Sequence, residues 1–320
     1  MIATQQILRE HTLVASDPAE EAYLREGFSA LLPLQSDMEA RLRGVLKDTL
    51  AHPGSLVRAR LAFGILREHG VERMRSRELA IAIEYFHTAS LLFDDLPCMD
   101  HAIERRGHAC PHVIYGEAAA MLGALGFVNQ GYALLWGVLN QLPSARRQMA
   151  TQLVSECLGI QGILDGQSRD LHFADGRNGE SEVIRVALGK TATLIRMTLL
   201  LPAVVAGAGE EERELLEDIS LAWGLAYQVL DDFKDCLTAY RDTGKTGLRD
   251  EILGRPNLPH VAGHDRARAV LTECLDKGAL TLDALARNGA TWYGLQQVQS
   301  FLESEACALA SRLDVPAVVS

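Results

Sequence analysis

The chain reads SLLFDDLPCMDHAIERRG from Ser90 to Gly107, where an apolar run ends in two adjacent aspartates. A second stretch, LAYQVLDDFKD from Leu225 to Asp235, repeats this arrangement in the last third of the chain. Each pair is followed within a few residues by a third aspartate. The six carboxylates are Asp94, Asp95, Asp100, Asp231, Asp232 and Asp235. Two such clusters predict a shared chemical purpose.

Both clusters are expected on helices. Residues 79–93 are apolar on nearly every side of a helical projection, which predicts a helix buried in a large core. In the second cluster Gln228, Asp231 and Asp235 share one helical face, about 5 and 11 Å apart along the axis. A solvated acidic turn or an N-cap is the ordinary explanation of one Asp-Asp pair. The helix dipole, however, disfavours carboxylates at a C-terminal end, so capping does not explain two pairs that each follow an apolar run.

Magnesium explains the carboxylates better. Buried carboxylates are costly unless a cation meets them. Hard oxygen ligands without a His or Cys pattern suit Mg²⁺, which is often shared between one or two carboxylates and the phosphates of a substrate. The sequence therefore predicts a polyphosphate substrate held by several Mg²⁺ ions between two helices.

Composition limits the remaining possibilities. The chain has 320 residues, 48% of them hydrophobic, and a net charge of −11 without a basic block, so we expect no nucleic-acid partner. Six cysteines without metal spacing are typical of reduced thiols in a cytoplasm. They are Cys98, Cys110, Cys157, Cys236, Cys274 and Cys307. The first residues, MIATQQILRE, resemble neither a signal peptide nor a transit peptide, which also favours a cytoplasmic location.

One uncharged segment raises the question of a membrane span. Residues 118–145 contain no charged side chain and are long enough to cross a bilayer. Polar side chains interrupt them at Asn129, Gln130, Asn140 and Gln141. We therefore expect a central helix surrounded by other helices, and no membrane span.

Helical periodicity dominates the rest, and no alternating β run of useful length is present. The predicted helices cover 20–50 with a break at Pro33, then 56–69, 77–96, 112–140, 144–173, 181–206, 210–237, 264–287 and 292–312. The predicted class is all-α. No linker divides the chain, so we predict a single domain over 1–320, with about 1–18 as a loose N-terminal arm.

Cationic residues accompany the acidic clusters. Arg105-Arg106-Gly107 follows the first cluster, Lys190-Thr191 lies in the 181–206 helix, and Lys245 and Arg255 follow the second. Each motif alone is usually a solvated face. Beside two Asp clusters they favour a diphosphate site, because an Arg fork matches phosphate oxygens and Lys adds a point charge.

These motifs together, DDLPCMD, RRG, LGKT, YQVLDDFKD and GKT with a later RD, resemble the trans-isoprenyl diphosphate synthases over about residues 42–313. The resemblance implies ten or more helices around a deep central cavity, which is the isoprenoid synthase fold, and a homodimer. It implies three Mg²⁺ ions and head-to-tail condensation of an allylic diphosphate with isopentenyl diphosphate.

The resemblance also assigns roles to residues. Asp94, Asp100 and Asp231 would hold the metal ions, with Asp95, Asp232 and Asp235 in support. Arg105, Lys190 and Lys245 match positions that bind the allylic diphosphate. Gln167, Asp170, Thr191 and Gln228 match the lining of the reacting centre, with Lys190 and Gln228 counted among the catalytic residues. Arg58, His87 and Arg106 match the isopentenyl diphosphate site.

The resemblance fails at one segment. Where the family shows Gly-Gly-Lys-Arg-x-Arg, this chain reads Pro53-Gly54-Ser55-Leu56-Val57-Arg58. Ser55 replaces the lysine that grips isopentenyl diphosphate. Losing one charge-assisted contact, worth about 1.5–3 kcal/mol, weakens binding roughly tenfold to a hundredfold. Two alternatives therefore stay open: a terpene cyclase that needs no isopentenyl diphosphate, and a non-catalytic subunit of a heteromeric synthase.

Product length depends on the helix before Asp94. Ala89 and Ser90 are small residues about one turn earlier, and Pro97-Cys98 follows the first Asp pair. This combination resembles the geranylgeranyl type, so the expected product is C20, with farnesyl, C15, as the alternative. Phe86, Phe127 and Tyr132 are the alternative candidates for closing the floor of the cavity.

Overall fold

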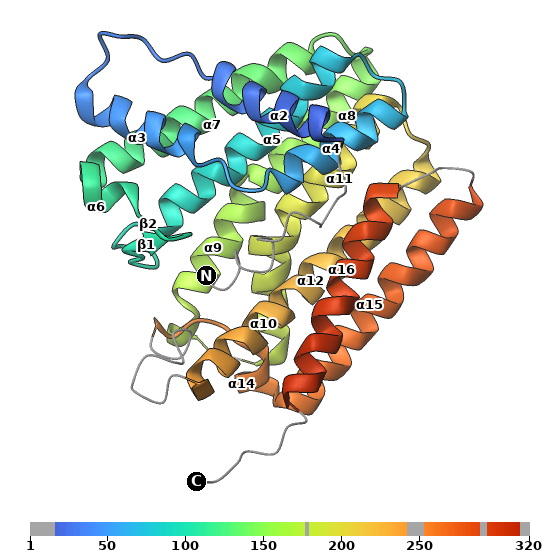
Figure 1. The fold of residues 1–320 in the computed structure, drawn as a ribbon. Coiled ribbons are helices and arrows are strands. Elements are labelled where there is room, and N and C mark those ends of the chain that lie inside the picture. Colours follow the sequence, from blue (N-terminus) through green and yellow to red (C-terminus); the bar gives the residue numbers. More distant parts are fainter. Residues whose placement is uncertain (1–16, 177–178, 242–252, 289–292, 314–320) are drawn as a thin grey trace. The chain divides into compact units, whose positions relative to one another are not determined.

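The computed structural model describes residues 17–176, 179–241, 253–288 and 293–313 (Figure 1). Their regular secondary structure is helical except for one hairpin of two-residue strands, so the all-α prediction is confirmed. The chain forms two compact units. Unit 1 comprises residues 1–153 and 198–208, and unit 2 comprises 154–197 and 209–320. The predicted single domain with a deep central cavity stays a prediction.

In unit 1, a short hairpin accompanies the helices. The helices are α2 (Pro18–Ala30), α3 (Ala40–Ala51), α4 (Val57–Glu68), α5 (Arg73–Asp94), α6 (Pro111–Tyr115), α7 (Glu117–Leu139), the first part of α8 (Ser144–Leu158) and the last part of α11 (Thr193–Ala206). The strands are β1 (Glu104–Arg105) and β2 (His108–Ala109), paired antiparallel. The predicted 112–140 helix is divided at Gly116, whose φ of 90° is unfavourable for other residues.

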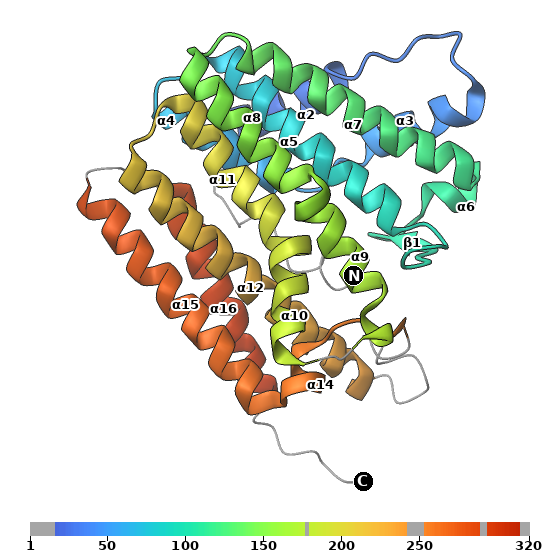
Figure 2. The same cartoon turned by 180° about the vertical axis from the view of Figure 1, so that it is seen from behind.

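The long helix α5 lies at the centre of unit 1 and runs beside α7 (Figures 1 and 2). Its side chains from Leu79 to Phe86 are almost all buried, as the sequence predicts. Tyr85 packs edge-on against Phe28 and Phe127, with ring centroids 5.2 and 5.3 Å apart, and its hydroxyl donates to the Phe28 carbonyl at 2.7 Å. Phe127 is therefore a core residue.

Unit 2 contains two π-helical turns that the sequence does not predict. Its elements are the end of α8, the π turn Ile160–Leu164, α9 (Asp165–Leu171), a 3₁₀ turn Phe173–Asp175, α10 (Glu180–Ala187), the π turn Leu188–Ala192, the start of α11 (Thr193–Ala206), α12 (Glu210–Arg241), α14 (Leu258–Ala262), α15 (His264–Arg287) and α16 (Tyr293–Leu313). Gly162, at φ −102° and ψ −121°, interrupts the predicted 144–173 helix. A Cβ there would lie 2.1 Å from the Glu156 carbonyl oxygen, so only glycine fits.

Helices α12, α15 and α16 pack together in unit 2 (Figures 1 and 2). Trp223 of α12 is fully buried, and its indole N–H donates to Gln299 of α16 at 2.7 Å. Glycine at 278 on α15 allows this approach, because a Cβ there would lie 2.4 Å from the Gln299 amide oxygen.

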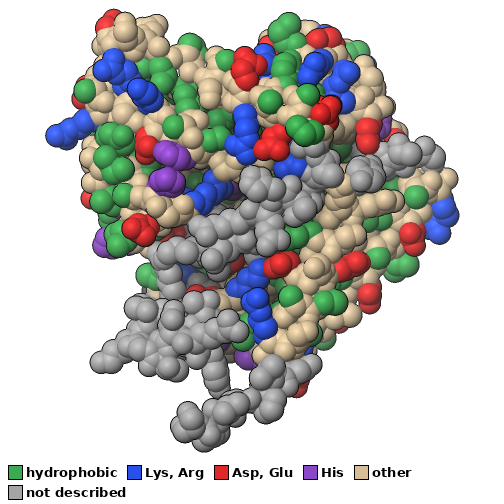
Figure 3. Space-filling model, viewed as in Figure 1, with side chains coloured by type: hydrophobic (Ala, Val, Ile, Leu, Met, Phe, Trp, Pro, Cys, Tyr) green, Lys and Arg blue, Asp and Glu red, His purple; other side chains and the backbone are tan. Residues whose placement is uncertain are grey.

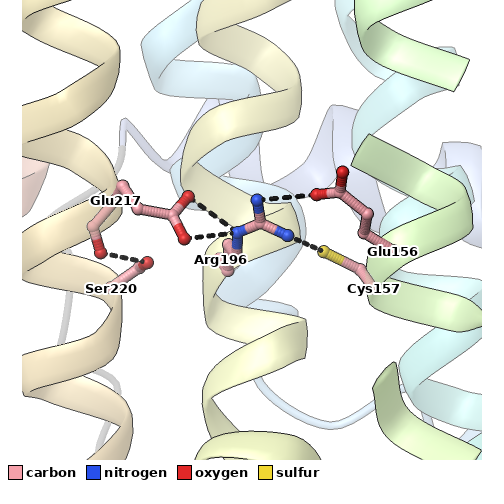
Figure 4. A network of polar contacts seen from close by, with 5 residues as sticks. All are labelled: Glu156, Cys157, Arg196, Glu217 and Ser220. Carbon is pink, nitrogen blue, oxygen red and sulfur yellow. Dashed lines mark hydrogen bonds and ion pairs between the residues drawn. The ribbon is translucent and has the colours of Figure 1, made fainter. Parts of the chain in front are cut away.

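Arg196 joins α8, α11 and α12 through one guanidinium group (Figure 4). Its Nε donates to both oxygens of Glu217 at 2.7 Å, and Nη2 donates to Glu156 at 2.9 Å. Nη1 lies 3.6 Å from the sulfur of Cys157, and burial raises the pKa of that thiol to about 11. The network holds α11 against α8 and α12 at Arg196, which is five residues after Thr191.

Two helical stretches have the length and apolar composition of a membrane span, Glu117–Leu139 and Glu180–Ala206. Core helices pass the same test, and the second stretch is mostly buried. In α7 only 33% of the apolar window is buried, so this helix is not surrounded within unit 1 as expected. Its exposed large side chains are Met121, Leu122, Leu125 and Trp136.

On the face shown in Figure 3, basic and acidic side chains are interspersed.

Replacing Arg196 with alanine should destabilise unit 2. The change removes charge-assisted hydrogen bonds to Glu217 and Glu156, so we expect the free energy of unfolding to fall by about 1–3 kcal/mol. The control is Arg185→Ala, since Arg185 is 63% exposed and its ion pair with Glu182 should contribute less than about 0.5 kcal/mol. Urea denaturation measures both, and equal losses would contradict the structural role of Arg196.

Candidate diphosphate and metal site

The first acidic cluster lies where α5 ends. Asp94 is the last residue of the helix and Asp95 is its C-cap. The chain then folds back, because the Asp100 amide donates to the Asp94 carbonyl at 2.9 Å and the Ala102 amide to the Asp95 carbonyl at 3.2 Å. All three carboxylates are buried, with at most 8% of each residue exposed. The loop thus brings Asp100 back to the helix end.

Asp95 forms an ion pair with Arg105 on β1. Arg105 Nε lies 2.7 and 2.8 Å from the two carboxylate oxygens, and Nη2 lies 2.5 Å from Oδ1. Burial opposes the charge on Arg105, but the hydrogen bonds and charge of Asp95, with the charge of Asp94, raise its pKa above the ordinary value. The guanidinium predicted to bind a diphosphate is thus held beside the acidic cluster by Asp95.

A pocket of about 360 Å³ opens beside this pair in unit 1. Its charged and titratable lining residues are Arg25, Asp48, His52, Glu84, His87, Asp95, Arg105, Arg106, His108 and Cys110. Ser55 and Arg58 are not among the lining residues. Three arginines, three histidines and three carboxylates line the pocket, so an anion there would be bound by particular arginine and histidine donors and not by a net positive charge.

Gly54 shapes the pocket wall. It has a φ of 73°, and a Cβ at this position would lie 2.0 Å from Nη1 of Arg106. Arg106 itself has a φ of 55°, which is unusual for a side chain of its size. The glycine therefore allows the Arg106 guanidinium to lie against the backbone at the start of the Ser55 segment.

Glu84 is a polar group of this site that the sequence reasoning missed. Its carboxylate is buried and accepts the Ala59 amide at 2.9 Å, in the first turn of α4. Burial raises the pKa of Glu84, while the charges of Arg58 and Arg106 act in the opposite direction. The available signal was a lone acid in an apolar run, three residues before His87.

His87 lies one turn along α5 from Glu84. Burial, together with the nearby charges of Arg58, Arg106 and Arg105, holds its pKa well below the ordinary value. The ring is therefore neutral at physiological pH. Its Nδ1 is shielded from solvent and has no hydrogen-bond partner among the described residues. A neutral imidazole with an available nitrogen suits a hydrogen bond to a bound substrate.

In unit 2, Lys190 and Asp170 form a second ion pair. Lys190, in the π turn, donates to Asp170 of α9 at 2.5 Å, and Arg255 lies 3.6 Å from the same carboxylate. Backbone contact at two glycines makes this possible, because a Cβ on Gly166 would lie 2.3 Å from the Gly189 carbonyl carbon. The cation predicted to bind the allylic diphosphate is thus fixed in place by the π turn.

A chain of hydrogen bonds leads from that turn to the second acidic cluster. Thr191 donates to the Gln228 amide oxygen at 2.8 Å, and Gln228 donates to Asp232 at 2.9 Å. The other Asp232 oxygen accepts the Leu258 amide at 2.8 Å. Asp232 therefore orients Gln228 and anchors the start of α14, as a supporting residue would.

The remaining predicted residues have these positions. Asp231 is buried, while Asp235, Gln167, Ser55, Arg58 and Ser90 are half-buried and Ala89 is buried. Lys245 lies outside the described residues. The first cluster belongs to unit 1 and the second to unit 2. That they face each other across a substrate stays a prediction.

The acidic clusters suit magnesium by their chemistry. Among the described residues, no three His, Cys, Asp or Glu side chains gather as ligands of one ion. Magnesium does not require this, because it keeps waters and takes one or two carboxylates together with substrate phosphates. Buried oxygen ligands at a helix end, beside a pocket that contains Arg105 and Arg106, fit that pattern.

Comparison with known proteins identifies relatives over most of the chain. The family model described as polyprenyl synthetase matches residues 39–286. A geranylgeranyl diphosphate synthase of Pantoea ananas is 31% identical over 293 residues, covering 90% of this chain and 95% of that protein. Another, from Pseudescherichia vulneris, is 32% identical over 250 residues, covering 78% and 79%.

Solved structures agree in fold. An FPP/GFPP synthase from Zymomonas mobilis has a TM-score of 0.72 at 21% identity and covers 96% of this chain and 100% of that one. A geranyltransferase from Helicobacter pylori, complexed with magnesium and isoprenyl diphosphate, has a TM-score of 0.69 at 25% identity, covering 93% and 99%. The predicted isoprenoid synthase fold is thereby confirmed.

Replacing Asp94 or Asp231 with alanine should abolish turnover while leaving the fold intact or slightly more stable. Each change removes a predicted metal ligand and also relieves repulsion between buried carboxylates. Product formation and melting temperature, with and without Mg²⁺ and a diphosphate analogue, measure the two effects. Asp283→Ala, on the exposed surface of α15, is the control. Near-normal activity in Asp94→Ala would refute the metal-site assignment.

Proposed function

Because the chain belongs to the polyprenyl synthetase family, we propose that it condenses isopentenyl diphosphate with an allylic diphosphate in a Mg²⁺-dependent reaction. The proposed product is geranylgeranyl diphosphate, which two bacterial relatives carry in their names. The observation that carries the proposal is the pocket at the Asp95–Arg105 pair, because its arginine and histidine donors could bind a second diphosphate next to the acidic cluster.

We assign different residues to the two diphosphate groups, that of the allylic substrate and that of isopentenyl diphosphate. Arg105, oriented by Asp95, and Lys190, oriented by Asp170, are proposed to stabilise the allylic diphosphate as its C–O bond breaks. Mg²⁺ ions held by Asp94, Asp100 and Asp231, three in number by family resemblance, would add Lewis-acid neutralisation of the leaving group. Gln228 and Thr191 are proposed to line the reacting centre.

The second substrate enters as a nucleophile. Its homoallylic double bond attacks the allylic cation, and a proton is then lost, in our proposal to the departing diphosphate. We propose that its diphosphate is bound by Arg106, His87 and Arg58. Arg106 and His87 line the pocket, and the charge of Arg58 lowers the pKa of both Glu84 and His87, which also line it. No dedicated side-chain base is required.

The pocket also favours a synthase over the two alternatives, a terpene cyclase and a non-catalytic subunit. A terpene cyclase uses one diphosphate, so a second diphosphate site at Arg106 and His87 would have no use there. A non-catalytic subunit does not require six buried or half-buried aspartates in two clusters. None of the six cysteines forms a disulfide among the described residues, which accords with the proposed cytoplasmic location.

A product assay tests the activity. The purified protein with Mg²⁺ is incubated with dimethylallyl, geranyl or farnesyl diphosphate, with and without isopentenyl diphosphate, and products are identified by mass. We expect C20 diphosphate only when isopentenyl diphosphate is present. Product formed without it would establish a cyclase, and no product under either condition would favour the non-catalytic subunit.

Product length is proposed to depend on α5. At about 100° per residue, Ser90 lies roughly 40° and Ala89 roughly 140° from Asp94 around the helix. Phe86 lies on the Ser90 side, against Tyr132 at 4.9 Å between ring centroids. Because Ala89 and Ser90 are both small, they leave room for a C20 chain.

Bulky replacements at these positions should shorten the product. We expect Ala89→Phe and Ser90→Phe to give mainly C15, since a ring in the path of the growing chain stops elongation. Met74→Phe, at an exposed site in the first turn of α5, is the control for added bulk. An unchanged distribution in both test variants would show that other residues build the floor.

We also propose a homodimer. The exposed face of α7 carries Met121, Leu122, Leu125 and Trp136 and no charge beyond Glu117. An uncharged apolar face of this kind suits a second copy of the chain. Sedimentation velocity measures the oligomeric state.

A further inference from the structure

Two histidine rings stack in the wall of the pocket beside Asp95 and Arg105. His52 is the C-cap of α3, and His108 belongs to β2. Their ring centroids are 4.2 Å apart and the ring planes meet at 38°. Both rings line the pocket with Arg105 and Arg106. His52 lies three residues before Ser55, so the stack adjoins the segment where the expected lysine is absent.

The hydrogen bond of His52 determines what its other nitrogen can do. Nδ1 lies 2.9 Å from the Asp48 carbonyl oxygen, which can only accept, so Nδ1 carries the hydrogen. In the neutral ring Nε2 then has no hydrogen to donate. Protonation gives Nε2 a hydrogen, and the Asp48 carboxylate lies 3.5 Å from Nδ1.

We propose that His52 and His108 together bind the diphosphate of isopentenyl diphosphate and replace the missing lysine. The proposal rests on the proposed prenyltransferase function. The other charged or titratable groups that line this pocket are Arg25 on α2, Asp48 on α3, Glu84, His87 and Asp95 on α5, Arg105 and Arg106 in the hairpin, and Cys110 before α6. Two adjacent imidazolium ions repel each other, and an anion bound against the edges of both rings offsets this cost.

The replacement makes substrate binding depend on pH. Lysine keeps its charge throughout the physiological range, whereas histidine gains a proton as the pH falls from 8 to 6. Binding of the anionic substrate favours the protonated rings. The Michaelis constant (KM) for isopentenyl diphosphate should therefore be lower at pH 6.5 than at pH 8, relative to a variant without the two rings.

The test compares wild type, His52→Ala, His108→Ala and the double variant, assayed with saturating Mg²⁺ at pH 6.5, 7.2 and 8. Removing charge-assisted contacts should raise the KM for isopentenyl diphosphate about tenfold or more in the double variant at pH 6.5. The KM for the allylic substrate should change less than about twofold. The substrate's own titration affects all variants equally, so the difference between profiles reports the histidines.

His69→Ala is the matched control. His69 is the C-cap of α4 and its Nδ1 bonds a carbonyl four residues earlier at 2.8 Å, as in His52, but it does not line the pocket. Melting temperatures show whether each variant still folds. A second double variant, His52→Gln with His108→Gln, keeps polar side chains at both positions and so separates loss of binding from loss of folding. An unchanged KM and pH profile in the double variant would overturn this inference, whereas a wild type that never consumes isopentenyl diphosphate would overturn the proposed function instead.

Discussion

The buried carboxylates at the end of α5 are the constraint on which unit 1 depends. Asp94 and Asp95 lie at the negative end of the helix dipole and almost out of contact with water. Each of these factors disfavours a negative charge. The compensation is local: Arg105 binds Asp95 at three atom pairs, and the following loop is tied back to the helix by backbone hydrogen bonds. The hairpin that carries Arg105 therefore serves both the fold and the site.

The pocket beside Asp95 and Arg105 contains arginines that are charged and a histidine, His87, that is neutral. Arginine stays charged in any accessible environment, so Arg105 and Arg106 give the pocket permanent positive charge. Their field and burial keep His87 neutral, although it lies on the same helix as Asp94. The charge of Arg106 also lowers the pKa of Glu84, against the effect of burial, and the Glu84 carboxylate accepts a hydrogen bond from the first turn of α4. A diphosphate would thus meet fixed cations first and a neutral hydrogen-bonding ring beside them.

Sequence patterns predicted the elements that follow simple periodicity. The apolar run before Asp94 and the polar stripe of α12 became long helices with ends within a few residues of those expected. The π turns were not predictable in this way, because they depend on contacts such as that between Gly166 and Gly189, which are distant in sequence. The same holds for the His52–His108 stack. The sequence could thus predict site residues that lie on regular helices. It could not predict the positions of site residues that depend on loops or on contacts between distant parts of the chain.

The Ser55 segment shows how a local change can alter a binding site without disturbing the fold. Leu56, where the family resemblance leads one to expect arginine, has a φ of 51° and caps α4 without a side-chain hydrogen bond. That conformation costs roughly 1–2 kcal/mol. Leu56 is 1% exposed, and full burial of a leucine side chain contributes about 1.5–3 kcal/mol, which offsets the strain. An arginine with this buried orientation would lack that gain. The segment is therefore anchored by an apolar contact, and the positive charge needed for a diphosphate must come from neighbouring side chains that remain at the pocket wall.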